Sequence, residues 1–294
     1  MRCPQGPAGS SPASGTTLSA RAEAARRVMS SLAGRVAVVT GGSRGIGRAI
    51  ALRLARDGAD CVITYRRNEK AAVEAVRAVE ALGRRAVAER LELSEPEQVG
   101  SLFERVAAAF GRVDVLVANA AATAFRPLLE QKPHNVRRTF AISVDAFVAM
   151  AQAAVPLMKG RAGRIVLISG IDSFQAMGGH SVLGAAKAAA ESLVRGMALE
   201  LGPLGITVNG VTPGFIGTDS STYYVSEGLG LDYAQATKRL LAATPVRRHG
   251  TPEDVAGLVG YLVSDAAAFL TGQCIVIDGG LTITSPLTRM ADGP

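Results

Sequence analysis

The amino-acid sequence predicts an α/β protein: a doubly wound parallel sheet with helices on both faces, in a single domain. Short apolar segments alternate with amphipathic segments of ten or more residues along most of the chain. A glycine-rich turn directly follows the first apolar segment and opens the first amphipathic one. The 294 residues are 48% hydrophobic and 19% charged, which is enough apolar material for a core on both faces of a sheet.

The apolar segments have the lengths and the β-branched composition of strands. In chain order the predicted strands are Val36–Val39, Cys61–Tyr65, Arg85–Leu91, Val113–Val117, Arg164–Ser169, Ile206–Val211 and Cys274–Ile277. Helical spacing of apolar residues predicts helices over Arg44–Arg56, Glu69–Leu82 and Pro96–Phe110, and long helices before the fifth and sixth strands. Such crossovers join parallel strands, and ligands of these sheets bind at the carboxyl ends of the strands.

Residues 1–33 differ in composition from the rest of the chain. They are rich in Pro, Gly, Ser, Ala and Arg and contain one acidic residue, Glu23. We interpret them as a disordered N-terminal tail, or as the result of a start site placed too early, with Met29 as the alternative start. A transit peptide is a third interpretation, whereas a secretory signal is not expected because no apolar run is present. The predicted domain then spans residues 34–294.

The charged residues and the cysteines exclude several classes of protein. The formal net charge is +7, but the arginines are spread along the chain without a basic block, so nucleic-acid binding is not expected. No stretch reads as long and apolar enough to cross a membrane. The three cysteines, Cys3, Cys61 and Cys274, show no disulfide or metal-ligand spacing. This pattern predicts a cytoplasmic protein without a metal site.

The first predicted strand runs into the turn Thr40-Gly41-Gly42-Ser43-Arg44-Gly45-Ile46-Gly47. Glycines allow a tight turn and a close approach of the backbone to a pyrophosphate, and the helix that follows presents its N–H groups to the phosphates. A position between a strand and a helix is the one that a Rossmann-type dinucleotide site requires. The predicted cofactor-binding residues of this turn are Gly41, Ser43, Arg44, Gly45, Ile46 and Gly47.

The end of the second strand indicates which dinucleotide is bound. A site that prefers NAD usually carries an acidic residue here, which binds the ribose hydroxyls. This chain has Arg66 and Arg67 instead, and no carboxylate until Glu69. Guanidinium groups suit the 2′-phosphate of NADP(H), and Arg44 adds a third. The alternative is that Arg66 and Arg67 simply begin a solvated helix.

Together these motifs resemble those of the short-chain dehydrogenase/reductase superfamily over residues 35–284. By this resemblance, Glu92 and Leu93 lie beside the adenine ring, with Glu where Asp is usual. Asn119 and Ala120 belong to the cofactor segment after the fourth strand. The segment that would cradle the nicotinamide contributes Pro213, Gly214, Ile216 and Thr218. The resemblance also implies a homotetramer or homodimer, and a substrate lid over residues 218–245.

The catalytic pattern of the family is only partly present. Members of the superfamily usually combine Asn, Ser, Tyr and Lys, and Lys187 matches the lysine, which binds the nicotinamide ribose. The tyrosine position, four residues earlier, is Leu183. The serine position is Gly170, although Ser169 is adjacent, and the position of the relay asparagine is Ser143. The candidate catalytic residues among these are therefore Lys187, Ser169 and Ser143.

His180 is the fourth candidate catalytic residue. It lies seven residues before Lys187, the spacing at which the enoyl-acyl-carrier-protein reductases of this superfamily carry their tyrosine. An imidazolium titrates near neutrality and can donate a proton or hold an enolate oxygen. The alternative is a histidine that only packs against the helix of Lys187. Tyr223 or Tyr224 of the lid could supply the missing hydroxyl instead, although packing within the lid is the favoured interpretation for both.

These observations predict an NADPH-dependent reductase of an enoyl thioester or a related conjugated carbonyl compound. Such a reduction tolerates the loss of a strong tyrosine donor, because the enolate can be held by hydrogen bonds and protonated on carbon by water. The pattern is closest to that of the type III enoyl reductases. An atypical ketoreductase of secondary metabolism is one alternative. A protein that binds the cofactor but is redox-silent, or catalyses a non-redox reaction, is another.

Overall fold

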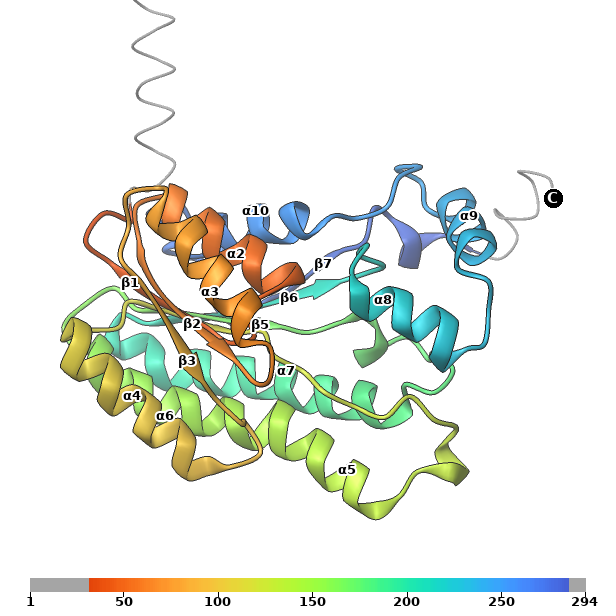
Figure 1. Cartoon of the computed structure of the whole chain (residues 1–294), viewed down its shortest axis with the longest axis horizontal. Coiled ribbons are helices and arrows are strands. Elements are labelled where there is room, and N and C mark those ends of the chain that lie inside the picture. The colour runs from red at the N-terminus through yellow and green to blue at the C-terminus, as the bar shows by residue number, and fades with distance from the viewer. Residues whose placement is uncertain (1–31, 286–294) are drawn as a thin grey trace, which may run out of the picture.

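The computed structural model describes residues 32–285, and these form one parallel sheet of seven strands covered by helices (Figure 1). The strand order is β3-β2-β1-β4-β5-β6-β7. The chain therefore runs outward in one direction from β1 to β3 and in the other from β4 to β7. The strands are β1 (Val36–Val39), β2 (Asp60–Tyr65), β3 (Ala86–Arg90), β4 (Val115–Ala118), β5 (Arg164–Ile168), β6 (Thr207–Pro213) and β7 (Cys274–Ile277). This confirms the predicted fold class, and it places the topological switch between β1 and β4.

Successive residues of each strand face opposite sides of the sheet, and both sides are apolar. In β1, Val36 and Val38 belong to the core on one face, and Ala37 and Val39 to the core on the other. All four are buried, which explains why the strands are continuous apolar runs rather than alternating ones.

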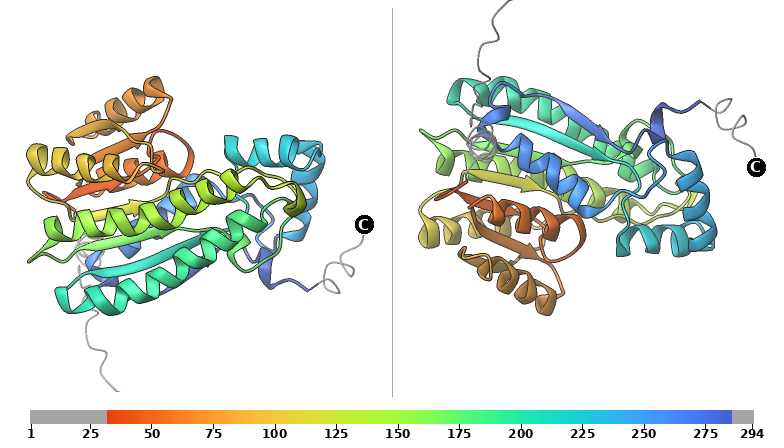
Figure 2. Two further views of the ribbon diagram at one scale, coloured as in Figure 1. Left: turned by 90° about the horizontal axis from the view of Figure 1, so that it is seen from below. Right: turned by 90° about the horizontal axis from the view of Figure 1, so that it is seen from above.

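Three helices cover one face of the sheet, and a second group covers the other, as Figures 1 and 2 show. The first group consists of α2 (Gly45–Arg56), α3 (Glu69–Glu80) and α10 (Pro252–Leu262). The second consists of α4 (Pro96–Phe110), α5 (Pro133–Phe140), α6 (Ala146–Met158) and α7 (Ser181–Leu201). The short α8 (Asp219–Tyr223) and α9 (Tyr233–Ala243) lie beyond the ends of the strands. They form most of the segment predicted as a lid.

The predicted strands and helices differ from the observed ones by at most two residues at either end. Residues 1–31 and 286–294 lie outside the described part, and so do Cys3 and nearly all of the predicted tail. Leu32, which the sequence placed in that tail, is 1% exposed and packs into the core beside α2. The folded part therefore begins no later than Leu32.

One helical stretch, Pro133–Met158, is long and apolar enough to cross a membrane by length and composition alone. This corrects the expectation from the sequence that no stretch is long and apolar enough to cross a membrane. Phe147 and Met150, on the α6 part of the stretch, are almost fully buried against the sheet. The apolar character of α6 is thus explained by its place in the core.

The two cysteines within residues 32–285 are free. Cys61 is fully buried in β2, and burial, with a smaller contribution from Asp60, raises the pKa of its thiol to about 12. Cys274 is partly buried, and burial raises its pKa to about 11. Both thiols are therefore protonated at neutral pH, as expected of small apolar side chains rather than reactive ones.

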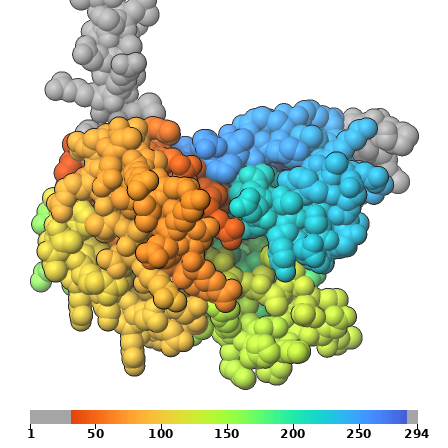
Figure 3. Space-filling model, viewed as in Figure 1, coloured from red at the N-terminus to blue at the C-terminus, as the bar shows by residue number. Residues whose placement is uncertain are grey.

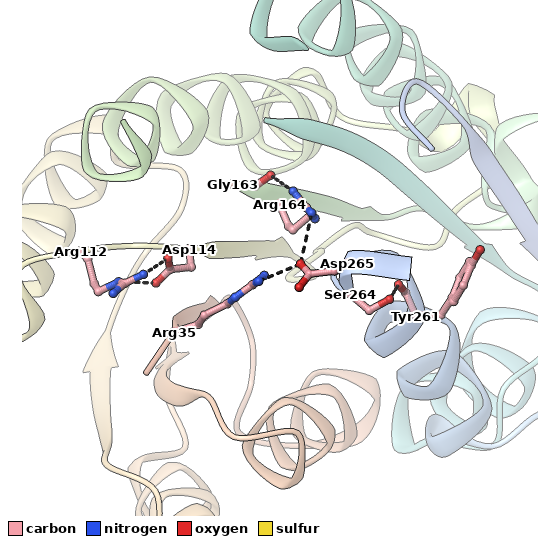
Figure 4. A network of polar contacts seen from close by, with 8 residues as sticks. All are labelled: Arg35, Arg112, Asp114, Gly163, Arg164, Tyr261, Ser264 and Asp265. Atoms are coloured by element: carbon pink, nitrogen blue, oxygen red, sulfur yellow. Dashed lines mark hydrogen bonds and ion pairs between the residues drawn. The ribbon is translucent and has the colours of Figure 1, made fainter. Parts of the chain in front are cut away.

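Charged side chains join the strands at their amino ends (Figure 4). Asp114 precedes β4, accepts a hydrogen bond from the backbone N–H of Val36 at 2.8 Å, and pairs with Arg112. Asp265 pairs with Arg35 at 2.8 Å and lies 3.7 Å from Arg164. These contacts tie β1, β4 and β5 to the segment after α10, on the edge of the sheet opposite the glycine turn.

Candidate active site

A cavity of about 1040 Å³ lies at the carboxyl ends of the strands. Figure 3 shows a hollow between the N-terminal part of the domain and the segment that carries α8 and α9. Every residue predicted to bind the cofactor lies on the wall of this cavity. These residues are Gly41, Ser43, Arg44, Gly45, Ile46, Gly47, Arg66, Arg67, Glu92, Leu93, Asn119, Ala120, Lys187, Pro213, Gly214, Ile216 and Thr218.

The glycine turn has the close packing that a dinucleotide site needs. A Cβ atom at Gly47 would lie 2.4 Å from the carbonyl oxygen of Gly41, so only glycine fits there. The amide of Asn119 donates to the carbonyl of Thr40 at 2.8 Å, and its backbone N–H donates to the Thr40 hydroxyl at 3.0 Å. These bonds fix the turn to the end of β4. No side chain caps the N-terminus of α2, which leaves that helix end available to a phosphate.

A basic cluster borders the adenine end of the cavity. Arg66 lies 3.3 Å from Glu92, and Arg138 of α5 lies 3.2 Å from the same carboxylate. Burial, and next the charge of Arg138, lowers the pKa of Arg66, while Glu92 acts in the opposite sense. With Arg67, which is exposed, the cluster carries three guanidinium groups and one carboxylate. This excess of positive charge fits a phosphate ester. Sequence reasoning missed Arg138, because it lies on a different helix.

Arg44, in the glycine turn, also lines the cavity. Its guanidinium is 3.4 Å from the carboxylate of Asp219, the first residue of α8, and both side chains are largely exposed. Thr218 precedes α8 and caps it, because its hydroxyl accepts a hydrogen bond from the backbone N–H of Ser221 at 3.3 Å. The glycine turn and the segment predicted as a lid are therefore in contact through an exposed ion pair.

Lys187, in α7, lines the floor of the cavity and is largely buried, with 6% of its surface exposed. Its ammonium group donates a hydrogen bond to the carbonyl oxygen of Ile168, at the end of β5, at 2.6 Å. Burial lowers the pKa of Lys187, and the nearby charges of Asp172 and Glu191 oppose this effect. A lysine held in this way has a fixed position and lies on the cavity wall.

His180 contacts two aromatic rings and a carboxylate. Phe125 stacks on its ring with centroids 4.8 Å apart, and Tyr224 meets the ring edge-on at 4.2 Å. The Nδ1 atom lies 3.0 Å from Oδ2 of Asp172, and both side chains are nearly buried. The other ring nitrogen, Nε2, is buried and has no hydrogen-bond partner within the described part of the chain.

Two predicted serines also carry a buried hydroxyl without a partner among the described residues, Ser143 and Ser169. Ser169 follows β5 and lies on the cavity wall. Ser143 does not line the cavity, and its neighbour Ile142 does. Ser143 lies in a π-helical turn, Ala141–Asp145, between α5 and α6. Unpaired buried hydroxyls are uncommon in folded proteins and call for an explanation.

The positions that the family resemblance assigns to the catalytic tyrosine and serine carry no hydroxyl group in this chain. Leu183 and Gly170 both line the cavity at these positions. The hydroxyl of Tyr224 donates to the carbonyl of Gly178 at 3.0 Å, whereas the Tyr223 side chain is 59% exposed. In this structure the Tyr224 ring thus packs against His180, and its hydroxyl is bonded to Gly178.

Sequence reasoning missed Asp172 and Phe125. The one feature of the sequence that could have indicated a role for Asp172 is its position two residues after Gly170, where the family usually has serine. Nothing in the sequence indicated that Phe125, in the loop after β4, would stack on His180.

Comparisons with known proteins identify similar sequences and structures. A family model described as Enoyl-(Acyl carrier protein) reductase matches residues 41–282. The chain is 41% identical to 1-cyclohexenylcarbonyl-CoA reductase of Streptomyces collinus over 86% of this chain and 88% of that protein. A short chain dehydrogenase from Burkholderia cenocepacia J2315, solved in complex with NADP, is 38% identical, with a TM-score of 0.79 over 86% of this chain and 99% of that one. A blue fluorescent protein from a metagenomic library, solved with NADPH, is 37% identical, with a TM-score of 0.77 over 85% and 99%.

Proposed function

The chain belongs to the short-chain dehydrogenase/reductase family, and from this premise we propose that it is an NADP(H)-dependent reductase of conjugated thioesters. The substrate class is an enoyl thioester or a related α,β-unsaturated carbonyl compound. The similarity to a reductase named for a cyclohexenylcarbonyl-CoA substrate supports this class. So does the match to the enoyl reductase model over residues 41–282.

The residues present fit NADP(H). The close contact at Gly47 and the uncapped N-terminus of α2 suit the pyrophosphate. The cluster of Arg66, Arg67 and Arg138 suits the 2′-phosphate, and no acidic residue at the end of β2 would repel it. When bound, this cofactor supplies a hydride. Lys187 would hold the nicotinamide ribose from the floor of the cavity.

The observation that carries the proposal is at His180: this residue lines the cavity, and its buried Nε2 has no hydrogen-bond partner within the described part of the chain, while the tyrosine position of the family is Leu183. Reduction of a ketone leaves an alkoxide, which needs a strong proton donor at oxygen. Conjugate reduction leaves an enolate, whose charge is shared between oxygen and the α-carbon. Hydrogen bonds from His180 and Ser169 would hold the enolate oxygen, and water would protonate the α-carbon.

The rest of the cavity wall suits an apolar acyl group. Aromatic and aliphatic residues lie on the wall near His180 and on part of the segment predicted as a lid, next to polar residues of that segment such as Asp232, Gln235 and Arg239. The apolar ones include Phe125, Met177, Leu183, Tyr224, Val225, Leu229 and Leu231. Such side chains bind a hydrocarbon chain or ring. Because Tyr224 covers the imidazole, the lid must shift for the thioester carbonyl to reach Nε2.

The test is the consumption of NADPH by the purified chain with three thioesters: 1-cyclohexenylcarbonyl-CoA, a linear 2-enoyl-CoA and a matched β-ketoacyl-CoA. We expect NADPH oxidation with at least one of the two enoyl compounds, abolished by Lys187→Ala. Oxidation with the ketone alone would favour the ketoreductase alternative. Saturable NADPH binding without oxidation in any assay would favour a redox-silent protein, and either result would overturn the proposal.

A further inference from the structure

Gly170 stands at the serine position of the family, and the side chain of Asp172 fills the space next to it. A Cβ atom at Gly170 would lie 2.5 Å from Oδ1 of Asp172. Any residue with a side chain at this position would therefore force the carboxylate to move. The loss of the serine and the presence of Asp172 are thus sterically linked.

A second glycine holds the same segment in place from the other side. A Cβ atom at Gly184, in the first turn of α7, would lie 2.2 Å from the backbone carbonyl oxygen of Asp172. The short 3-10 turn Ile171–Ser173 therefore packs directly on the helix that carries Lys187. This packing brings Asp172 to His180, the residue that immediately precedes α7.

The carboxylate of Asp172 has few other partners. The Asp172 side chain is 7% exposed, and its described side-chain hydrogen bond is the one to His180 Nδ1 at 3.0 Å. The charged or titratable groups nearby are Lys187, which bonds to Ile168, and Tyr224, which bonds to Gly178. Glu191 is held by Ser173 and Thr212 at 2.9 and 3.0 Å. Asp172 is thus available to orient the imidazole.

We propose that Asp172 is a positioning residue that fixes the His180 ring, and that this pair, admitted by glycine at position 170, replaces the serine and tyrosine hydroxyls of the family. This inference rests on the proposed function for the identity of the substrate oxygen. The contact with Asp172 keeps a proton on Nδ1 and leaves Nε2 for the substrate. A carboxylate on one side of an imidazole also stabilises the imidazolium.

The hydride, released as a C–H bond of the nicotinamide breaks, would form a C–H bond at the β-carbon. The electron pair of the C=C bond then joins the α-carbon to the carbonyl carbon, and the electron pair of the C=O bond moves to the carbonyl oxygen. The Nε2–H group donates a hydrogen bond to that enolate oxygen, and the negative charge of Asp172 balances the imidazolium. A proton from water forms the C–H bond at the α-carbon as the carbonyl is restored, and the hydroxide left behind takes a proton from the solvent, so that each turnover consumes one NADPH and one proton. His180 keeps its proton throughout.

A double-mutant cycle of Asp172→Ala and His180→Ala tests the pairing. We expect each single variant to lower kcat about 10- to 100-fold, with the KM and the NADPH dissociation constant within about twofold. The double variant should lose no more than His180→Ala alone, because Asp172 acts through the ring. Losses that multiply in the double variant would overturn the inference. Ser173→Ala, in the same turn, is the matched control and should leave kcat unchanged.

A second cycle tests the steric link and does not depend on turnover. Gly170→Ser in the unchanged chain should lower the thermal midpoint by several degrees, because the new side chain meets the Asp172 carboxylate. In the Asp172→Ala background the same substitution should cost little. An equal loss in both backgrounds would contradict the link.

The two cycles separate this inference from the proposed function. If the chain reduces only a ketone, the proposed function fails, and the first cycle is measured with that ketone. If it reduces none of the thioesters, the second cycle still decides whether Asp172 fills the space at Gly170.

Discussion

The edge of the sheet formed by the amino ends of the strands differs from the edge formed by their carboxyl ends in how its buried polar groups are hydrogen-bonded. At the amino edge, Asp114 is nearly buried and binds both the N–H of Val36 and the guanidinium of Arg112. Arg35 and Arg164 each have one buried nitrogen without a hydrogen-bond partner among the described residues, but another nitrogen of each guanidinium is bonded. At the carboxyl edge, the Ser169 hydroxyl and His180 Nε2 have no partner within residues 32–285.

This difference indicates which edge is built for stability and which for chemistry. A buried polar atom without a hydrogen bond costs about 1–3 kcal/mol. A fold can carry that cost where a ligand later supplies the missing partner. Substitutions of the paired charges at the amino edge should therefore change stability and leave turnover intact, whereas substitutions of the polar side chains on the cavity wall at the carboxyl edge should lower turnover with less effect on stability.

The largest effect is expected at Lys187. Its replacement in Lys187→Met should lower kcat/KM by about 10³-fold, because the nicotinamide ribose and the charge near the reacting atoms lose their support. The folded state should persist, since methionine fills a similar apolar volume. Initial rates of NADPH oxidation and a thermal melt measure the two properties. A variant that melts well below the wild type would place Lys187 among the stabilising residues instead.

The opposite result is expected at Asp114. In Asp114→Ala, the buried N–H of Val36 loses its acceptor and Arg112 loses its partner, at a cost of about 2–4 kcal/mol in the free energy of unfolding. Asp114→Asn keeps an acceptor for Val36 and should recover part of that loss. Urea unfolding gives the free energies. A fall in kcat for the folded Asp114→Asn protein would contradict the claim that substitutions at the amino edge leave turnover intact.

A smaller effect is expected at the adenine end of the carboxyl edge. Arg66→Ala should raise the KM for NADPH about tenfold and leave that for NADH nearly unchanged, because one charge-assisted contact with the 2′-phosphate is lost. Arg105→Ala is a suitable control, since this residue pairs with Glu89 outside the cavity. Equal changes for both cofactors would mean that Arg66 does not bind the 2′-phosphate.

The smallest effect is a pH dependence of stability. Burial lowers the pKa of Lys187 below its ordinary value of 10.5, so between the two values the unfolded chain binds more protons than the folded one. The free energy of unfolding should then rise with pH, by at most about 1.4 kcal/mol per pH unit, and level off near the ordinary value. Lys187→Met should lack this rise. An identical pH dependence in both proteins would contradict it.

The sequence predicted the elements of the fold well because their signals are local. The period-two and 3.6-residue patterns, and the glycine turn, depend on neighbouring residues. The same holds for Lys187 and His180, because their separation of seven residues can be counted in the sequence. The contacts of Asp172, Phe125 and Arg138 were not readable, because they arise where separate loops and helices meet. The side chain of Ser143 could not be placed either, because a π-helical turn shifts the register of its helix.

The destination of the hydride tests the central claim most directly. The measurement is the position of deuterium in the product formed from the reacting enoyl thioester and NADPH labelled at the transferred hydrogen, determined by mass spectrometry and NMR. Conjugate reduction at this site predicts one deuterium on the β-carbon and a solvent-derived proton on the α-carbon. Deuterium on the former carbonyl carbon, or none in the product, would contradict it.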